Sequence, residues 1–258
     1  MSMNPDWLIP QWPAPARVRA LCTTRSGGVS QAPYDSLNLG EQVGDDPLAV
    51  AANRRTFANS LAARPVFLSQ VHGSAVVTLA ADSGHGSVAD ASLTMQPGLA
   101  CTIMVADCLP VLFADTQGSV VAAAHAGWRG LAGQRGQGVL EQTLNRLCRV
   151  SATGVAADVM AWLGPCIGPQ TFEVGDDVRD AFTAQDQAAQ ALFRPQLAGK
   201  WVADLPGLAR LRLRRAGVAQ IYGNDGSQTW CTVSNPARYF SHRRDRVSGR
   251  MVACIWLA

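Results

Sequence analysis

The chain has 258 residues, with 22 Lys or Arg against 19 Asp or Glu, so its formal net charge is only +3. This length supports one large hydrophobic core, and we expect a single domain over residues 1–258. The charge provides no strong basic field. It excludes neither small anions nor nucleic acid by itself, but we expect no nucleic-acid partner.

Hydropathy and cysteine content indicate the cellular compartment. No apolar run approaches the ~20 residues of a membrane-spanning helix, and the first residues lack the basic and apolar regions of a secretory leader. The seven cysteines are an odd number scattered through apolar segments, which indicates reduced thiols rather than a disulfide framework. We therefore expect a cytoplasmic protein with no membrane partner, either a monomer or a weak homodimer.

Apolar runs bounded by Gly, Pro and Asp predict strands, and amphipathic segments predict helices. In chain order we expect a strand at 17–23, a helix at 47–62, strands at 65–71 and 75–79, a strand block at 101–124, a helix at 139–150, a strand at 158–164, helices at 176–189 and 205–216, and strands at 218–222 and 251–257. The strands outnumber the helices and cluster along the chain. This pattern favours an α+β domain in which helices cover sheets.

Three potential metal ligands lie at the ends of strand-like segments. His72 follows the run at 65–71, Cys108 lies between two apolar runs, and His125 ends a third. Two imidazoles and a thiol form an N₂S ligand set, which suits zinc with an open fourth position. A single buried Cys is commonly a small hydrophobe, and a single His a satisfied polar residue. Spacing alone leaves both interpretations open.

Many short motifs around these residues resemble the YfiH/YlmD family, also described as laccase-domain proteins, purine nucleoside phosphorylases or peptidoglycan editing factors. They cover nearly the whole chain in family order: TTRSGGVS (23–30), YDSLNLG (34–40), NRR (53–55), SQVHG (69–73), ADAS (89–92), ADCLPVLFAD (106–115), AAHAGWRG (123–130), GPCIGP (164–169), FEVG (172–175), FSHRRD (240–245) and GRM (249–251). The resemblance implies a four-layer α/β/β/α sandwich with mixed β-sheets. It also implies that the catalytic residues His72, Cys108 and His125 hold a zinc ion.

The resemblance further implies an enzyme acting on purine nucleosides. Phosphorolysis of adenosine, inosine and 5′-methylthioadenosine would yield the free base and a pentose 1-phosphate, and deamination would convert adenosine to inosine. The implied partners are therefore small purine nucleosides and phosphate. The residues are compatible with both reactions, because zinc sites are used to activate water and arginines to hold phosphate.

Several polar residues in the motifs are candidates for binding substrate. Arg54, Arg129 and Arg243 carry guanidinium forks that suit phosphate. Arg243 and Arg244 would point to opposite faces if FSHRRD formed a strand, so at most one would face a site. Asn38 could contact a ligand, although an Asn that holds a turn also fits its loop.

Two carboxylates are candidates for supporting the ligand histidines, which normally donate their second ring nitrogen to such a group. These are Asp107, which also suits a strand-end cap, and Glu173, which is additionally the best candidate for the catalytic general acid or base. The segment 130–138 departs from the family pattern, because it carries a few extra residues before the helix at 139–150.

Two other functions remain open. A cysteine hydrolase or amidase that edits peptidoglycan precursors would use Cys108 as nucleophile and His125 as base, but it would leave His72 without a role. A copper-dependent polyphenol oxidase is implied by the laccase label. The chain has only four histidines, too few for a laccase-type copper set, although copper bound at the N₂S site in vitro would oxidise phenols weakly.

Overall fold

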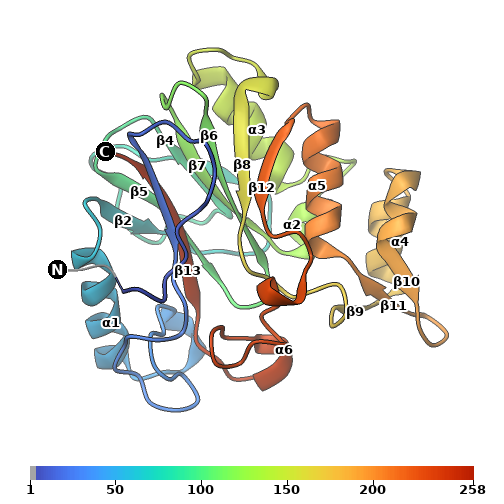
Figure 1. Ribbon diagram of the computed structural model, residues 1–258, viewed down its shortest axis with the longest axis horizontal. Coiled ribbons are helices and arrows are strands. Elements are labelled where there is room, and N and C mark those ends of the chain that lie inside the picture. Colours follow the sequence, from blue (N-terminus) through green and yellow to red (C-terminus); the bar gives the residue numbers. More distant parts are fainter. Residues whose placement is uncertain (1–3) are drawn as a thin grey trace.

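The computed structural model describes residues 4–258, and its strands form three sheets (Figure 1). In the four-stranded sheet the neighbours are, in order, Val18–Cys22 (β1), Met251–Leu257 (β13), Leu99–Val105 (β5) and Arg64–Phe67 (β2). In the six-stranded sheet they are Gln220–Gly223 (β12), Val159–Leu163 (β8), Leu109–Asp115 (β6), Val121–Ala126 (β7), Ala91–Thr94 (β4) and Val76–Thr78 (β3). A small sheet contains Phe193–Pro195 (β10), Lys200–Ala203 (β11) and Glu173–Gly175 (β9).

Helices border these sheets. The α-helices are Pro47–Asn59 (α1), Trp128–Ala132 (α2), Val139–Val150 (α3), Asp176–Thr183 (α4), Leu205–Arg215 (α5) and His242–Asp245 (α6). Short 3₁₀ helices span Glu41–Val43 (η1), Ala156–Asp158 (η2), Gln187–Leu192 (η3) and Gln228–Trp230 (η4). Within residues 4–258, no helix has the length and apolar content that crossing a membrane requires.

Both large sheets are mixed, as predicted. In the four-stranded sheet β13 is antiparallel to β1 and β5, whereas β2 runs parallel to β5. In the six-stranded sheet β6 is antiparallel to β7 and β8, while the outer strands β12 and β3 run parallel to their neighbours.

Strand β13 shows how side-chain alternation builds the layers. Val252, Cys254 and Trp256 pack in a core with Phe57 of α1. The intervening residues, from Met251 to Leu257, pack in a second core that also contains residues of the six-stranded sheet. Because successive side chains of a strand point to opposite faces, the four-stranded sheet is buried on both sides.

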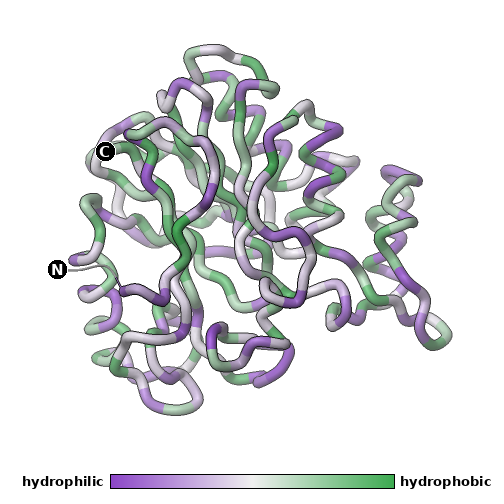
Figure 2. The backbone as a smooth tube through the Cα atoms, viewed as in Figure 1, coloured by the Kyte–Doolittle hydropathy of each residue, from purple (hydrophilic) through white to green (hydrophobic). Residues whose placement is uncertain are grey.

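The six-stranded sheet is buried on both sides in the same way. Leu112 and Ala114 of β6 contribute to the core between the sheets, whereas Val111 and Phe113 pack in a third core with α3 and α5. Three cores therefore separate four layers: α1, the two large sheets, and the α3–α5 layer. This is the predicted α/β/β/α sandwich, and Figure 2 shows hydrophobic positions following its central strands.

Most predicted elements are present with small changes in their bounds. Helix α3 and strand β13 have the predicted limits, and the block at 101–124 divides into β5, β6 and most of β7. Three predictions were wrong in detail. The strand expected at 65–71 ends at Phe67, the helix expected at 176–189 ends at Thr183, and FSHRRD contains the short helix α6 rather than a strand.

Candidate metal centre and cleft

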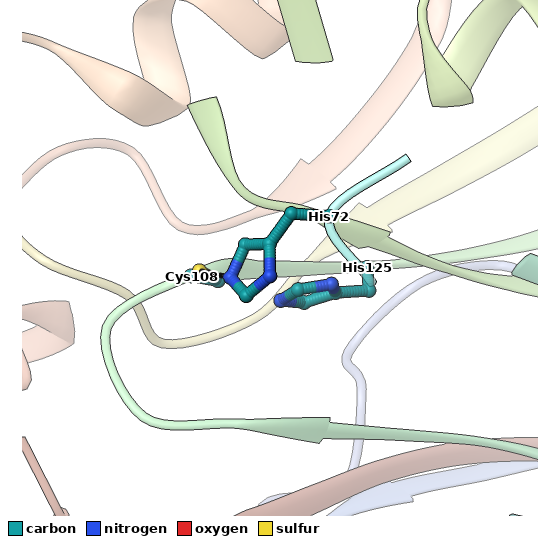
Figure 3. Close-up of side chains that lie close together, drawn as sticks. All are labelled: His72, Cys108 and His125. Atoms are coloured by element: carbon teal, nitrogen blue, oxygen red, sulfur yellow. Dashed lines mark hydrogen bonds between the residues drawn. The ribbon is translucent and has the colours of Figure 1, made fainter. Parts of the chain in front are cut away.

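The three predicted ligands converge although they lie far apart in the chain. His72 lies in the turn after β2, Cys108 immediately precedes β6, and His125 lies within β7. Their potential ligand atoms all lie within 4.8 Å of one another. Figure 3 shows the two imidazole rings close together in an edge-to-face arrangement, with the thiol of Cys108 beside the His72 ring. The ring centroids are 4.7 Å apart, with an interplanar angle of 75°.

This donor set fits zinc. Nε2 of His72 lies 3.7 Å from Sγ of Cys108. Tetrahedral zinc, with Zn–S and Zn–N bonds of about 2.3 and 2.0–2.1 Å, places sulfur and nitrogen ligands ~3.6 Å apart. Three protein ligands leave one position free, as in catalytic zinc sites. The residue types and the His72–Cys108 distance therefore fit a metal held by three protein ligands, with one position left for an exchangeable ligand.

A fully buried carboxylate, Asp90, holds both ligand histidines in place. Its Oδ1 lies 2.8 Å from Nδ1 of His125 and accepts the backbone N–H of His72 at 2.9 Å. Its Oδ2 accepts the N–H groups of Val71 and Gly73 at 3.2 and 2.7 Å. Because an ionised carboxylate only accepts hydrogen bonds, Nδ1 of His125 carries the proton and Nε2 is left as the ligand atom.

The charges of these groups are coupled. Burial raises the pKa of Cys108, but His125 and His72 outweigh it and lower the pKa to about 6. Burial lowers the pKa of His125, but the charges and hydrogen bonds of Cys108 and Asp90 outweigh it and raise the pKa to about 9. Burial likewise raises the pKa of Asp90, while its bonds from His125 and Gly73 lower it below the usual value. Near neutral pH the metal-free site therefore holds a thiolate beside a protonated His125, and metal binding would release the proton on Nε2.

Two glycines of the HAGWRG motif provide space for the ligands. A Cβ added at Gly127 would lie 2.9 Å from Cδ2 of His72 and 3.0 Å from Sγ of Cys108. A Cβ added at Gly130 would lie 2.5 Å from the carbonyl oxygen of Gly73, where α2 packs against the turn that carries His72. Both approaches are too close for any side chain.

Backbone strain is concentrated at the site. His72 and Asp107 are non-glycine residues with φ of 60° and 84°, a region that costs energy unless the surroundings impose it. The carboxylate of Asp107 accepts the Thr232 hydroxyl at 2.5 Å and the N–H of Arg243 at 2.7 Å. These bonds hold the backbone immediately before Cys108.

The triad lies in a cleft of about 760 Å³, within the ~300–1,000 Å³ range of small-molecule sites. Its walls include the aromatic residues Phe67, Trp128 and Phe172. Basic residues also line it: Arg54, Arg243, Arg246 and Arg250. The cleft therefore combines a metal-ligand set, apolar walls and a concentration of positive charge.

Two of the three arginines that were predicted to bind phosphate line the cleft, and the third does not. Arg54 and Arg243 line the cleft. Arg129 does not, because it is exposed on α2 and stacks 4.5 Å over the Trp128 ring. Helix α6 places Arg243 at the cleft, while Arg244 bonds to backbone carbonyls, including that of Thr232 at 2.7 Å. The prediction that only one of these two faces the site therefore stands, but its strand-based reason was wrong.

Two other residues that were predicted to belong to the site, Asn38 and Glu173, do not line the cleft. Asn38 is fully buried, and its amide bonds to Gly40, to Asp45 and to the backbone N–H of Arg250. It holds a turn rather than reaching the cleft. The carboxylate of Glu173 is about half exposed and lies 3.8 Å from Nζ of Lys200, outside the cleft lining.

The prediction that Asp107 or Glu173 supports the ligand histidines was therefore wrong for His125, whose ring bonds to Asp90 instead. Sequence reasoning missed Asp90, although it lies in the ADAS motif directly before β4. It also missed Arg250, which follows Gly249 in the GRM motif, and Arg246. In each case the motif was visible, but the contact depends on chain segments that are distant in sequence.

Comparison with known proteins gives a consistent result. A profile of the family described as "Multi-copper polyphenol oxidoreductase laccase" matches residues 19–258. A Pseudomonas aeruginosa protein named purine nucleoside phosphorylase is 53% identical, over 97% of this chain and 98% of its own. The Escherichia coli purine nucleoside phosphorylase YfiH is 48% identical, over 97% of this chain and 98% of its own.

Solved structures agree with the fold. The Neisseria meningitidis protein NMB0706 superimposes with a TM-score of 0.88 at 45% identity, covering 98% of this chain and 99% of its own. YlmD from Geobacillus stearothermophilus gives a TM-score of 0.86 at 32% identity, covering 100% of this chain and 98% of its own. With the triad and fold described above, these matches show that the chain belongs to the YfiH/YlmD family.

Proposed function

We propose that this protein is a zinc-dependent purine nucleoside phosphorylase. The observation that supports it most strongly is the convergence of His72, Cys108 and His125 within 4.8 Å in an arginine-lined cleft. Relatives named purine nucleoside phosphorylase match nearly the whole chain. The substrates that we propose are adenosine, inosine and 5′-methylthioadenosine, together with inorganic phosphate.

His72, Cys108 and His125 would hold the ion, and bound zinc supplies Lewis-acid catalysis by polarising an oxygen ligand. Asp90 keeps the proton on Nδ1 of His125 and thereby keeps Nε2 available. The Trp128 and Phe172 side chains provide apolar walls that exclude water from part of the cleft.

In phosphorolysis, an oxygen of phosphate forms a bond to the anomeric carbon of the nucleoside as the bond from that carbon to the purine nitrogen breaks. The bond's electron pair leaves with the purine, which takes up the proton that hydrogen phosphate gives up, and the products are the base and a pentose 1-phosphate. The unmatched positive charge of the cleft favours binding of the phosphate dianion. We also propose deamination of adenosine to inosine in the same cleft, since an activated water can displace ammonia from adenine.

The test is product identification with purified zinc-loaded protein. With inosine and phosphate we expect hypoxanthine and ribose 1-phosphate in equal amounts, and with adenosine we expect inosine in addition to adenine. The variants His72→Ala and Cys108→Ala should lose both zinc and activity, whereas Cys148→Ala, on the far helix α3, should retain both. Absence of base release from all three nucleosides would contradict the proposal.

A cysteine hydrolase is the second candidate, and one observation favours it. The pKa of Cys108 is lowered to about 6, so the residue is a potential nucleophile with His125 beside it. The position of His72, with Nε2 at 3.7 Å from the same sulfur, favours the metal instead, since a hydrolase would need only one imidazole.

We further propose a cytoplasmic location. Cys22, Cys101, Cys166, Cys231 and Cys254 are buried free thiols, and Cys108 and Cys148 are also free. Such a cysteine population is typical of a reducing compartment.

A further inference from the structure

The four arginines of the cleft differ in whether a carboxylate neutralises them. Arg54 forms an ion pair with Glu41, which also lines the cleft. Arg243, Arg246 and Arg250 form no ion pair with any residue in the described range 4–258. Three guanidinium groups therefore face one cleft without a counter-charge of their own.

The acidic residues that line the cleft form no ion pair with these three within the described part of the chain. Glu41 is occupied by Arg54. Asp107 uses one carboxylate oxygen for the Thr232 hydroxyl and the other for the backbone N–H of Arg243. The cleft thus has a surplus of positive charge, which favours an anionic ligand.

Strand register places Arg250 near the metal triad. Met251 of β13 pairs with Val105 of β5, so Arg250 flanks Ala106, two residues before Cys108. Its Nη1 donates to the carbonyl oxygens of its own turn at 2.9 and 3.1 Å. Nε and Nη2 have no hydrogen-bond partner within residues 4–258. Burial lowers its pKa, and the charges of Cys108 and Asp107 oppose that shift.

Arg243 and Arg246 lie at the two ends of the short turn formed by α6. The backbone of Arg243 is tied to Asp107, and its Nη1 donates to the Glu173 carbonyl oxygen at 2.9 Å. Arg246 follows α6 with φ of 64°, a conformation unfavourable for a long side chain, and its N–H donates to the carbonyl of His242 at 2.8 Å. Its side chain makes no hydrogen bond to any described residue, although it lines the cleft. Such local strain is commonly retained at a binding site.

We propose that Arg250, Arg243 and Arg246 form the binding site for the inorganic phosphate substrate, on the β13 side of the metal triad. This inference rests on the proposed phosphorylase function and names the residues that hold its second substrate. Guanidinium groups bind phosphate through paired, charge-assisted hydrogen bonds, and three unpaired ones suit a dianion. Arg54 is not part of this phosphate site, because its guanidinium group is already paired with the carboxylate of Glu41.

The test is the dependence of phosphorolysis on phosphate in the zinc-loaded protein. In Arg250→Gln and Arg246→Gln we expect the KM for phosphate to rise about tenfold or more, the usual effect of losing a charged hydrogen-bond pair. The KM for inosine should change less than threefold. Arg129→Gln is the matched control, since this arginine is adjacent to Trp128 of the cleft wall but points to solvent; both constants should stay unchanged.

Direct binding of orthophosphate, measured by calorimetry without nucleoside, separates the subsite from the overall function. If orthophosphate binds more weakly to both variants but the protein releases no base, the result supports the phosphate site and contradicts the proposed phosphorylase function. Phosphorolysis with an unchanged phosphate KM in both variants contradicts the subsite alone, as does a large rise in Arg54→Gln only. If AMP inhibits by competing with inosine but not with phosphate, the result supports a site for orthophosphate. If AMP competes with phosphate, and Arg250→Gln weakens this inhibition, the arginines bind the phosphate group of a nucleotide instead.

Arg250 also bonds to its own turn, so Arg250→Gln removes bonds on which the fold of this turn depends. For this reason Arg250→Lys, which keeps the charge but loses the fork, is compared in parallel. Arg246 has an exposed side chain, and Arg246→Gln should leave the melting temperature unchanged. A phosphate KM that stays at the wild-type value in folded Arg250→Lys and Arg246→Gln would overturn the proposal.

Discussion

Asp90 and His125 form the buried pair on which the metal-ligand set depends. Oδ1 of Asp90 lies 2.8 Å from Nδ1 of His125, while the same carboxylate accepts the backbone N–H of His72. One side chain therefore fixes the ring orientation of one ligand and the backbone position of another. Carboxylates in this role raise the basicity of the ligand and orient it toward the metal.

Replacing Asp90 with Asn should reduce zinc affinity. The amide has only one acceptor oxygen for four donors, so at least one N–H of the His72 turn or of His125 loses its partner. Loss of such a supporting group typically costs 10–100-fold in metal affinity. Competition with a chromophoric chelator measures this without an activity assay.

The control for this variant is Asp115→Asn. Asp115 is also fully buried and accepts N–H groups of Ser119 and Val120, but in the turn between β6 and β7. The Asp115→Asn variant should have a lower melting temperature but an unchanged affinity for zinc. Equal zinc affinity in Asp90→Asn and wild type would refute the role of Asp90.

A methyl group at Gly127 should damage the site through space rather than charge. The added Cβ would lie 2.9 Å from the His72 ring and 3.0 Å from the Cys108 sulfur. Overpacking of this kind costs about 1–3 kcal/mol, and here the two ligands must move to relieve it. Gly127→Ala should therefore bind less zinc per chain. Gly84→Ala, where nothing lies within 4 Å of the added Cβ, is the control and should bind zinc normally.

The sequence predicted the ligand set but not what supports it. His72, Cys108 and His125 end strand-like runs, and family motifs mark them clearly. Asp90 lies in the ADAS motif, but its role was not evident from the sequence, because its four partners come from the 71–73 turn and from β7, which only the tertiary fold brings together. The prediction for Arg129 was wrong because its closeness in sequence to His125 did not bring its side chain into the cleft: it is exposed and stacks on Trp128.

The same distinction holds for the fold. Strong local patterns predicted α3 and β13 because amphipathic and continuous apolar runs are local properties. The short strand β4 was missed, as was the sheet of β9, β10 and β11, because three- or four-residue strands give little periodic signal. The layering followed from family resemblance, since no local pattern reveals that β13 is buried on both faces.

Alkylation should distinguish Cys108 from the other thiols. In metal-depleted protein its pKa of about 6 means that the reactive thiolate is nearly complete at pH 7 and declines as the pH falls through 6. Burial raises the pKa of Cys22 and Cys101 to about 12, so they stay protonated. Iodoacetamide at pH 7 should modify Cys108 first, with a half-maximal rate near pH 6, and zinc should protect it.

The partly exposed Cys148 is the internal comparison, because burial raises its pKa and its labelling should still be increasing above pH 8. Peptide mapping by mass spectrometry gives both rates from one sample. Faster labelling of Cys148 than of Cys108 at pH 7 would show that the two imidazoles do not stabilise the thiolate.

The 130–138 segment should depend on Arg212 for its position. Arg212 forms a largely buried ion pair with Glu141 at 2.8 Å, and its Nη2 donates to the carbonyl of Gly136 at 2.7 Å. Removing one partner of such a pair leaves the other unsatisfied, at a cost of about 1–3 kcal/mol. Arg212→Ala should lower the free energy of unfolding by that amount in urea denaturation. The exposed pair of Arg215 and Asp186 is the comparison, and Arg215→Ala should have a clearly smaller effect.

Chelation with reconstitution, combined with intact-mass analysis, decides between the metal enzyme and the cysteine hydrolase. A hydrolase would form a covalent adduct on Cys108 during turnover and would work without metal. A zinc enzyme should lose activity with chelator, regain it with Zn²⁺ and show no mass increase. The position of both imidazoles beside the thiol, with His72 at 3.7 Å, leads us to expect the second result. Alkylation alone does not decide, because blocking a ligand thiol also displaces the metal. Activity that survives complete demetallation, with an adduct mapped to Cys108, would establish the hydrolase instead.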